Sequence, residues 1–259
     1  MYNPSGCYGT VHKTLAVIRK MIITKKIEYE DNDLTYEGVL AFDESSKTKL
    51  PIVMIAHAFG GQSKFEENKA IELAKLGYVG FAIDIYGKGV RAKSPEDAQQ
   101  LMDKLNSDRN LLLERMKTSL KTAKSIDIAD KSKIGGIGFC FGGKCVLDLA
   151  RSGEKLNGIV SFHGVYDSPK RPEKNKIETP ILILHGWDDP LAKPNDVLEL
   201  AQELTNKNAE WELNAYGHTG HAFTNPNARF PEKGLLYNKV SDKKSWNRMV
   251  EFFKNKFDE

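Results

Sequence analysis

The residue of this chain best suited to chemistry is a cysteine placed between glycines. The apolar run that begins at Ile134 leads into residues 138–142, Gly-Phe-Cys-Phe-Gly, which have the G-x-nucleophile-x-G form of a sharp turn from a strand into a helix. Cys140 holds the position usually taken by serine. A helix that begins at this turn directs its N-terminus at the thiol, which favours the thiolate and lowers the thiol pKa. The alternative is a glycine-rich turn that contains a buried free cysteine.

A nucleophilic thiol needs a base, and the base needs a group that orients it. In α/β-hydrolases an acid and then a histidine follow the nucleophile along the chain, and this sequence supplies candidates in that order. An apolar strand ends in a loop with Asp188 and Asp189, and a later β-rich segment ends in a loop with His218 and His221. Loops after such strands lie at the carboxyl edge of a parallel sheet, where open α/β sheets bind their ligands.

Three motifs together resemble those of the dienelactone hydrolase family, which is carboxymethylenebutenolidase-like and belongs to the α/β-hydrolase superfamily: residues 138–143, 185–190 and 221–223. The matching segments run from about residue 36 to residue 257. The resemblance implies a catalytic triad of Cys140, His221 and Asp189. It also implies an α/β-hydrolase fold, with a mostly parallel twisted sheet and helices on both faces.

Spacing within the two loops distinguishes the paired candidates. Asp189 fits the G-x-x-D spacing of the family, so Asp188 is expected to cap the turn or face solvent. His221 fits the H-x-F pattern of the family, so His218 is expected at the surface. Three further histidines follow apolar runs and are expected to bond to loop backbone at strand ends rather than to substrate: His57, His163 and His185.

Two backbone N–H groups are expected to stabilise a tetrahedral oxyanion. One is that of Phe141, directly after the nucleophile. The other is expected from the loop after the apolar strand 52–56, where Phe59 is the first candidate and Ala58 the alternative. The same Gly-Gly loop would also serve simply to connect a strand to a helix.

Three departures from the family pattern bear on the substrate. Ala58 replaces a loop glutamate of the family, Lys88 an arginine after the Asp-x-Tyr motif, and Asn225 an arginine beyond the histidine. Lys88 keeps a charge without the planar fork of arginine, Asn225 has no charge, and Arg91 either substitutes from the loop of Lys88 or lies in solvent. We therefore expect Lys88 and Asn225 near a substrate that is a neutral lactone or activated ester. Aromatic side chains expected near the site favour an apolar or cyclic acyl group, although each can also be core packing: Phe59, Tyr86, Phe141, Trp187 and Phe223.

Composition sets further bounds. The 259 residues, 40% of them hydrophobic, suit one α/β domain, expected over 21–259. A net charge of +3 without a basic cluster indicates no nucleic-acid partner, and no apolar stretch reaches the roughly 20 residues that span a membrane. An odd number of cysteines without secretory features favours a cytoplasmic, reducing location. No metal or nucleotide motif occurs, so we expect no metal, no cofactor, a small-molecule ester or lactone as partner, and a monomer or small homo-oligomer.

Residues 1–20 carry the weakest pattern. They lack the apolar core of a signal peptide, so a disordered or loosely packed extension is expected, with a targeting role as the alternative. The rest alternates as a parallel α/β sheet does. Strands are predicted at 22–29, 34–42, 51–56, 78–85, 133–139, 156–162, 180–184 and 209–215, the first two as an antiparallel edge. Helices are predicted at 65–76, 108–125, 141–151, 195–206 and 241–257, and a lid or insertion over the site at 87–107.

The sequence therefore predicts a cofactor-free carboxylic ester hydrolase. Cys140 would attack an activated carbonyl, His221 would hold or take the thiol proton, and Asp189 would fix the imidazole tautomer. Two other classes are compatible with the motifs. One is an esterase or thioesterase for a different substrate class. The other is a non-catalytic protein of this fold that binds ligands or senses redox state through a reactive thiol, which the absent loop glutamate supports.

Overall fold

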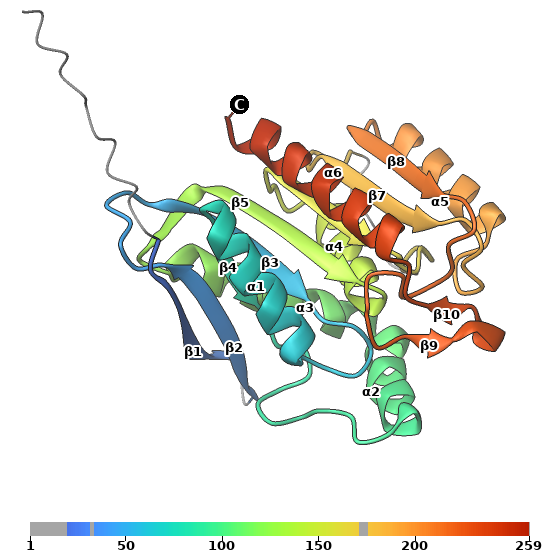
Figure 1. The fold of residues 1–259 in the computed structure, drawn as a ribbon, viewed down its shortest axis with the longest axis horizontal. Coiled ribbons are helices and arrows are strands. Elements are labelled where there is room, and N and C mark those ends of the chain that lie inside the picture. The colour runs from blue at the N-terminus through green and yellow to red at the C-terminus, as the bar shows by residue number, and fades with distance from the viewer. Residues whose placement is uncertain (1–19, 32–33, 171–175, 259) are drawn as a thin grey trace, which may run out of the picture.

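The computed structural model describes residues 20–31, 34–170 and 176–258. The described residues are built around one eight-stranded sheet with helices on both faces (Figure 1). The predicted α/β-hydrolase architecture is therefore confirmed. The predicted N-terminal extension, 1–20, lies almost wholly outside the described residues, and the division into this extension and one domain stays a prediction.

The sheet has the strand order β1-β2-β4-β3-β5-β6-β7-β8. β1 and β2 pair antiparallel, as predicted, and β2 also runs antiparallel to β4. The strands from β4 to β8 in this order are mutually parallel. The strands span Ile22–Asp31 (β1), Leu34–Asp43 (β2), Leu50–Ala56 (β3), Val79–Ala82 (β4), Ala129–Phe139 (β5), Gly158–Phe162 (β6), Ile181–Gly186 (β7) and Trp211–Tyr216 (β8).

Helices cover the two faces of the sheet unequally. α1 and α6 pack on one face, and α3, α4 and α5 pack on the other (Figure 1). α2 lies beyond the carboxyl ends of the parallel strands (Figure 1). The helices span Lys64–Leu76 (α1), Pro95–Ser107 (α2), Arg109–Ser125 (α3), Phe141–Arg151 (α4), Pro194–Asn206 (α5) and Lys239–Asp258 (α6).

Strand β3 shows why the central strands read as unbroken apolar runs. Ile52 and Met54 belong to the core on the α3–α4 face, whereas Val53 and Ile55 belong to the core on the α1–α6 face. Successive side chains of a strand point to opposite faces, so a strand covered on both faces needs apolar residues at every position. All four side chains are fully buried.

Several predicted elements differ in their bounds from the observed ones; β5, for example, begins four residues before its predicted start at 133. The strand predicted to reach residue 85 ends at Ala82, because the Asp84 carboxylate accepts hydrogen bonds from the N–H groups of Tyr86 and Gly87 and turns the chain. The region predicted as a lid, 87–107, contains the regular helix α2, which begins after the N-cap Ser94.

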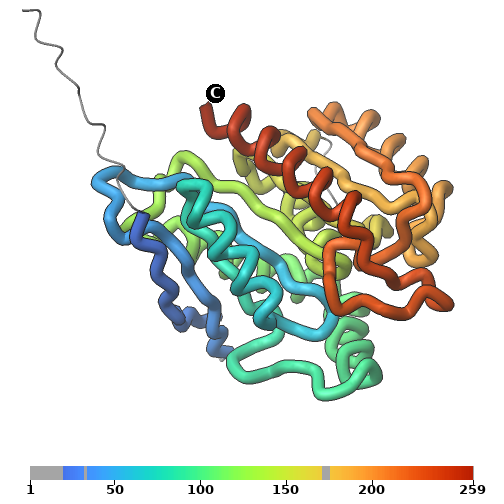
Figure 2. The backbone as a smooth tube through the Cα atoms, viewed as in Figure 1, coloured from blue at the N-terminus to red at the C-terminus, as the bar shows by residue number. Residues whose placement is uncertain are grey.

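A short hairpin was not predicted. It consists of β9 (Arg229–Phe230), a 3₁₀ turn (Pro231–Lys233) and β10 (Leu235–Leu236). Strands of two residues are too short to show a pattern in the sequence. Figure 2 shows this hairpin near α2, and both contribute residues to the cavity described below.

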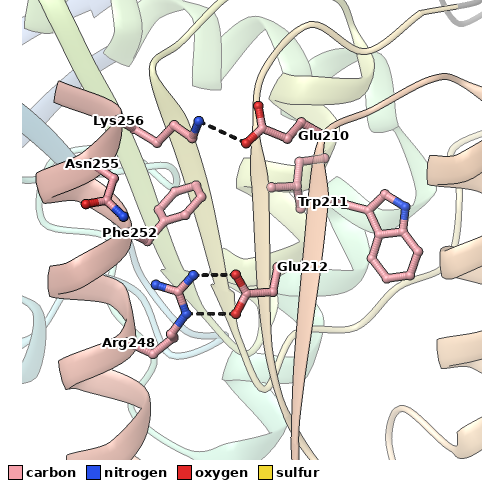
Figure 3. Close-up of a pocket in the computed structure, with 8 residues that line it drawn as sticks. Glu210, Trp211, Glu212, Arg248, Phe252, Asn255 and Lys256 are labelled. Atoms are coloured by element: carbon pink, nitrogen blue, oxygen red, sulfur yellow. Dashed lines mark hydrogen bonds and ion pairs between the residues drawn. The ribbon is translucent and has the colours of Figure 1, made fainter. Parts of the chain in front are cut away.

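Ion pairs tie α6 to the edge strand β8 (Figure 3). Arg248 donates to the Glu212 carboxylate from Nε, at 2.7 Å, and from Nη2. Nζ of Lys256 lies 2.9 Å from Oε1 of Glu210. These side chains and Phe252 line a groove of about 230 Å³ between the helix and the strand.

Candidate active site

Cys140 lies in the turn between β5 and α4, with φ 55° and ψ −116°. Residues other than glycine avoid this part of backbone space, so the turn is strained. Gly138 and Gly142 make it possible: a Cβ atom on Gly138 would lie 2.0 Å from the carbonyl oxygen of Gly142, and one on Gly142 would lie 2.1 Å from that of Ala56. The N–H of Cys140 donates to the carbonyl oxygen of Phe162 at 3.1 Å. The turn therefore presents the thiol at the carboxyl end of β5.

The two described cysteines have different surroundings. Cys140 is half-buried and lines a cavity, whereas Cys145 is fully buried within α4. Burial raises the pKa of the Cys145 thiol well above its usual value, which keeps it protonated and unreactive at neutral pH. The prediction that Cys145 packs in the core is confirmed, and Cys7 lies outside the described residues.

His221 and Asp189 are joined by a short hydrogen bond in a buried setting. Nδ1 of His221 lies 2.7 Å from Oδ2 of Asp189, and each residue is 2% exposed. Oδ1 of Asp189 accepts a hydrogen bond from the N–H of Leu191 at 2.8 Å, which holds the carboxylate in place. A carboxylate at Nδ1 keeps a proton on that nitrogen, so Nε2 is the atom that can exchange a proton with another group.

The Cys140 thiol and the His221 imidazole alter each other's protonation. Burial by itself raises the pKa of Cys140, but the charge and hydrogen bond of His221 and the N–H of Phe141 outweigh it, so this pKa lies below its usual value. Burial by itself lowers the pKa of His221, but the Cys140 thiolate and the Asp189 carboxylate outweigh it and raise this pKa to about 10. The interaction therefore favours a thiolate at Cys140 paired with an imidazolium at His221. Nε2 of His221 is buried and close enough to the thiol to affect its pKa, but it makes no hydrogen bond of good geometry with any described residue. Catalytic hydrogen bonds are often poorly aligned before substrate binds.

The second members of the two candidate pairs lie at the surface. The side chains of His218 and Asp188 are 104% and 56% exposed, and 4.0 Å separates Nδ1 of His218 from Oδ2 of Asp188. The expectation that both face solvent is confirmed.

The amides predicted to bind an oxyanion differ in availability. The N–H of Phe141, at the start of α4, interacts with the sulfur of Cys140 and contributes to its lowered pKa. Phe59 lines the same cavity as Cys140, and among the described residues its N–H has no hydrogen-bond partner. The N–H of the alternative, Ala58, already donates to Oε1 of Glu66 at 3.4 Å. Of the two N–H groups, only that of Ala58 is therefore already occupied by a protein acceptor among the described residues.

A cavity of about 460 Å³ opens beside Cys140 and His221. This volume lies within the range of small-molecule sites. Among the residues that the structure describes, no lysine or arginine lines it, and Glu66 is the single acidic residue in the lining. The apolar lining comes from loops and from α1, α2 and the β9–β10 hairpin, and includes Phe65, Met102, Val165, Leu191 and Leu235.

Of the two polar residues predicted to bind substrate, the structure brings one to the cavity. Asn225 is part of the lining. Lys88 is not, because its ammonium lies 2.7 Å from Oε1 of Glu28 on the surface of β1. Arg91 also lies outside the lining, and its guanidinium donates to Asp84 and Gln62.

Of the five aromatic residues expected near the site, Phe59 lines the cavity, whereas Tyr86, Phe141, Trp187 and Phe223 are not part of its lining. Tyr86 is 5% exposed, and its hydroxyl donates to the carbonyl oxygen of Phe59 at 2.9 Å. Phe223 is fully buried, with its ring centroid 5.2 Å from that of His163. Trp187 is 44% exposed. The structure thus assigns Tyr86 to the support of a loop and Phe223 to core packing.

His163 lies nearer to the candidate triad than the sequence predicts. It lines the cavity, its ring centroid is 5.0 Å from that of His221, and its Nε2 lies 2.8 Å from Oγ1 of Thr224. Burial and the charge of His221 lower the pKa of His163 well below its usual value, so it is neutral. The usable signal was its position directly after β6, the strand that pairs with β5.

The remaining histidines and one glutamate complete the surroundings. His57 bonds to backbone through both ring nitrogens, as predicted. His185 instead contacts a side chain, with Nδ1 3.1 Å from the hydroxyl of Tyr166. Glu66, 2% exposed on α1, lines the cavity, although the sequence shows only the Ser63-x-x-Glu66 spacing of a helix N-cap.

Within the part of the chain that the structure describes, no three His, Cys, Asp or Glu side chains are grouped as metal ligands would be. None of the described helices is both long enough and apolar enough to cross a membrane.

Comparison with known proteins places these features in context. The model of the dienelactone hydrolase family matches residues 36–257. Protein usf of Aquifex pyrophilus is 27% identical over 88% of this chain and 96% of its own length, and a candidate carboxymethylenebutenolidase of Aquifex aeolicus is 26% identical over the same shares. The solved structure of m3DLH has a TM-score of 0.86 and 30% identity over 91% of this chain and 99% of its own. A dienelactone hydrolase-like promiscuous phosphotriesterase from metagenomic libraries has a TM-score of 0.87 and 28% identity over the same shares.

Proposed function

The chain belongs to the dienelactone hydrolase family, and we propose that it is a cofactor-free hydrolase of neutral lactones or activated esters with Cys140 as its nucleophile. One observation carries the proposal. At a single cavity, a thiol with a lowered pKa interacts with a histidine that is bonded to a buried carboxylate. A carbonyl carbon bound there would meet a thiol whose ionisation the neighbouring imidazolium favours.

The reaction begins with attack of the Cys140 thiolate on the carbonyl carbon. A C–S bond forms, the carbonyl π electrons move to oxygen, and the amides of Phe59 and Phe141 stabilise the oxyanion. The tetrahedral intermediate collapses and expels the alkoxide, which takes a proton from Nε2 of His221. In a lactone this alcohol stays attached to the acyl group.

The second half of the reaction releases the acyl group from sulfur. Neutral His221 takes a proton from water, and the resulting hydroxide attacks the thioester carbonyl. Collapse of the second tetrahedral intermediate expels the Cys140 thiolate and leaves the His221 imidazolium, so the starting pair is restored. Asp189 holds the imidazole in the tautomer that both halves need.

The lining of the cavity supports a neutral substrate. A carboxylate on the substrate would need a cation to offset its desolvation, and no lysine or arginine lines the cavity. Lys88 is paired with Glu28 outside it. The apolar lining fits an apolar or cyclic acyl group.

A second substrate class is suggested by the same lining. Neutral phosphotriesters also carry no charge, and one structurally similar protein is described as a promiscuous phosphotriesterase. Thiolate attack on phosphorus would displace an alkoxide or phenoxide in the same cavity. We place this class second because attack on phosphorus leaves a phosphoryl group bonded to the sulfur of Cys140, and water must then attack a tetrahedral phosphorus to release it.

A panel of chromogenic esters, lactones and phosphotriesters tests the proposal, with and without prior alkylation by iodoacetamide. Cys140→Ala should abolish turnover of esters and lactones and leave the fold intact, whereas the matched control Cys145→Ala should keep most activity. Equal loss in two well-folded variants would contradict the assignment. A wild-type protein that is alkylated at Cys140 but turns over no substrate would instead favour a binding or redox-sensing protein. Turnover restricted to thioesters or other ester classes would favour the alternative substrate reading.

A further inference from the structure

In the loop after β3, three of the four backbone polar groups of Ala58 and Phe59 have hydrogen-bond partners. The carbonyl oxygen of Ala58 accepts from Nδ1 of His57 at 2.7 Å and from the N–H of Gly61 at 3.1 Å. His57 is in the tautomer that this bond requires, because its Nε2 accepts from the N–H of Ile85 at 3.2 Å. The proton of the ring is therefore on Nδ1.

Fixing this carbonyl also fixes the direction of the Phe59 N–H. The Ala58 carbonyl and the Phe59 N–H belong to one peptide group, which is planar and trans, so the two bonds point in opposite directions. Two donors hold the carbonyl on one side. The N–H of Phe59 must then point to the other side, where it has no partner among the described residues.

Two further side chains hold the groups on either side of this peptide. The hydroxyl of Tyr86 donates to the carbonyl oxygen of Phe59 at 2.9 Å. Oε1 of Glu66 accepts from the N–H of Ala58 at 3.4 Å, and its Oε2 accepts from the N–H and the hydroxyl of Ser63 at 2.8 Å and 2.7 Å. Burial raises the pKa of Tyr86 far above its usual value, so the hydroxyl remains a donor throughout the working pH range.

The three side chains come from separate parts of the chain and are all buried. His57 is 0% exposed, Glu66 2% and Tyr86 5%, and the rings of His57 and Tyr86 meet edge to face at 4.7 Å. Two glycines follow this peptide group: Gly60, with open space where a side chain would be, and Gly61, with φ 90°. Glycine restricts the backbone less than other residues do. Contacts from other side chains are therefore needed to hold the preceding peptide group in one orientation.

We propose that His57, Glu66 and Tyr86 form an oxyanion clamp, three positioning residues that preset the Phe59 N–H toward the tetrahedral oxyanion. This inference rests on the proposed function. Hydrogen-bond donors stabilise a transition state best when they are oriented beforehand and need no rearrangement during the reaction. The clamp supplies that orientation without contact between its side chains and the substrate carbonyl.

Two variants with matched controls test the clamp. Tyr86→Phe removes one hydroxyl and keeps the ring, and its control Tyr29→Phe removes a buried hydroxyl that donates to the Asp84 carbonyl at 2.8 Å, outside the loop. Glu66→Ala removes the acceptor for Ala58, and its control Glu67→Ala removes the neighbouring carboxylate of α1, which accepts from Lys64 outside the loop.

Ester turnover and thiol alkylation separate the clamp from a general structural role. Complete loss of one oxyanion donor costs about 10²–10³-fold in kcat, so a loosened donor should cost roughly 10- to 100-fold with KM unchanged. Alkylation of Cys140 by iodoacetamide forms no oxyanion and should proceed at the wild-type rate in both variants. Controls should stay within about twofold in kcat. Equal losses in turnover and alkylation, equal losses in variants and controls, or unchanged kcat in Tyr86→Phe and Glu66→Ala would each overturn the clamp.

A readout without substrate distinguishes failure of the clamp from failure of the proposed function. With ¹⁵N-phenylalanine labelling, the Phe59 amide should give one sharp signal in the wild type and a broadened or divided signal in Tyr86→Phe and Glu66→Ala. If no ester is turned over, the proposed function fails, and this signal still decides whether the three side chains hold the peptide. An unchanged Phe59 signal in both variants would overturn the clamp whatever the activity.

Discussion

The Cys140 cavity and the groove between α6 and β8 differ in how far their polar groups are paired with one another. In the groove, acids and bases from the helix and the strand are paired across the gap, Arg248 with Glu212 and Lys256 with Glu210 (Figure 3). In the cavity, a strained turn carries the thiol and the pKa of His221 is raised to about 10. Strain and unpaired groups do not help a protein to fold, so they mark a place where the molecule binds or reacts.

The contrast concerns the lining as well as the bonding. The groove is lined by paired charges, whereas the cavity is mainly apolar and has no lysine or arginine among its described lining residues. In a groove with paired charges, few polar groups are free to bind a ligand. An apolar cavity with a few oriented polar groups fits a small neutral molecule. Variants in the cavity should therefore change activity, and variants in the groove should change stability.

The largest effect is expected at the acid of the candidate triad. Asp189→Asn should lower kcat by about 10²–10⁴-fold, because the imidazole loses the partner that fixes its tautomer. Asp188→Asn, its exposed neighbour, should change kcat by less than about threefold. Steady-state kinetics on one activated ester would decide, and the reverse ranking would show that Asp188 orients the histidine.

The protonation of the thiol gives the next prediction. The pKa of Cys140 is lowered mainly by His221, so the thiolate is present above that lowered pKa and is lost as pH falls through it. In His221→Ala the pKa of Cys140 should rise, and the thiolate at pH 7 should fall about tenfold for each unit of the rise.

Alkylation by iodoacetamide, followed by mass spectrometry of the peptide that contains Cys140, measures this difference. The wild-type rate should rise to its plateau at a lower pH than the rate in His221→Ala, because the histidine lowers the pKa of the thiol. Superimposable profiles would show that the histidine does not set the protonation of the thiol.

Substrate charge should respond to the cavity lining and not to the surface. Asn225→Arg places a guanidinium at the cavity and should raise kcat/KM for an anionic lactone, relative to its neutral ester, by about tenfold, more at low salt. Lys88→Arg, whose position is paired with Glu28, should leave this ratio unchanged. A wild-type preference for the carboxylate that disappears in Lys88→Ala would contradict the placement of Lys88 outside the site.

The smallest effect is expected in the groove. Arg248→Ala removes a partly exposed pair with Glu212, which is worth about 0.2–1 kcal/mol, so the melting temperature should fall by roughly 1–4 °C. The kcat/KM for a neutral ester should not change. A loss of activity at unchanged stability would mean that the groove takes part in function.

Much of the fold could be predicted from the sequence because local rules act within single elements. The helix at 141–151 was predicted with its observed bounds, and β3 was one residue longer than predicted. The prediction of an element was wrong where a contact from outside the element sets its end, or where the element is very short. β4 ends early because the Asp84 side chain turns the chain, and the two-residue strands β9 and β10 have no period that a sequence could show.

The candidate site divides in the same way. Cys140, Asp189 and His221 occur in motifs with fixed spacing, and the structure brings the three side chains together. The surroundings depend on partners far away in the chain: Lys88 is held on the surface by Glu28, sixty residues earlier. Glu66 and Tyr86 bond to the Ala58–Phe59 loop because the fold brings them together, and no local pattern of residues predicts these contacts.

If Cys140 is the nucleophile, ester hydrolysis passes through a covalent acyl-enzyme at its sulfur, and this intermediate can be trapped. Wild-type protein mixed with an activated ester at neutral pH, quenched in acid within milliseconds and digested, should carry the mass of the acyl group on the peptide that contains Cys140. Neutral hydroxylamine should remove it, since it is a thioester. An ester that is turned over at steady state while no acyl group is found on Cys140, or while the acyl group is found on another residue, would contradict the account.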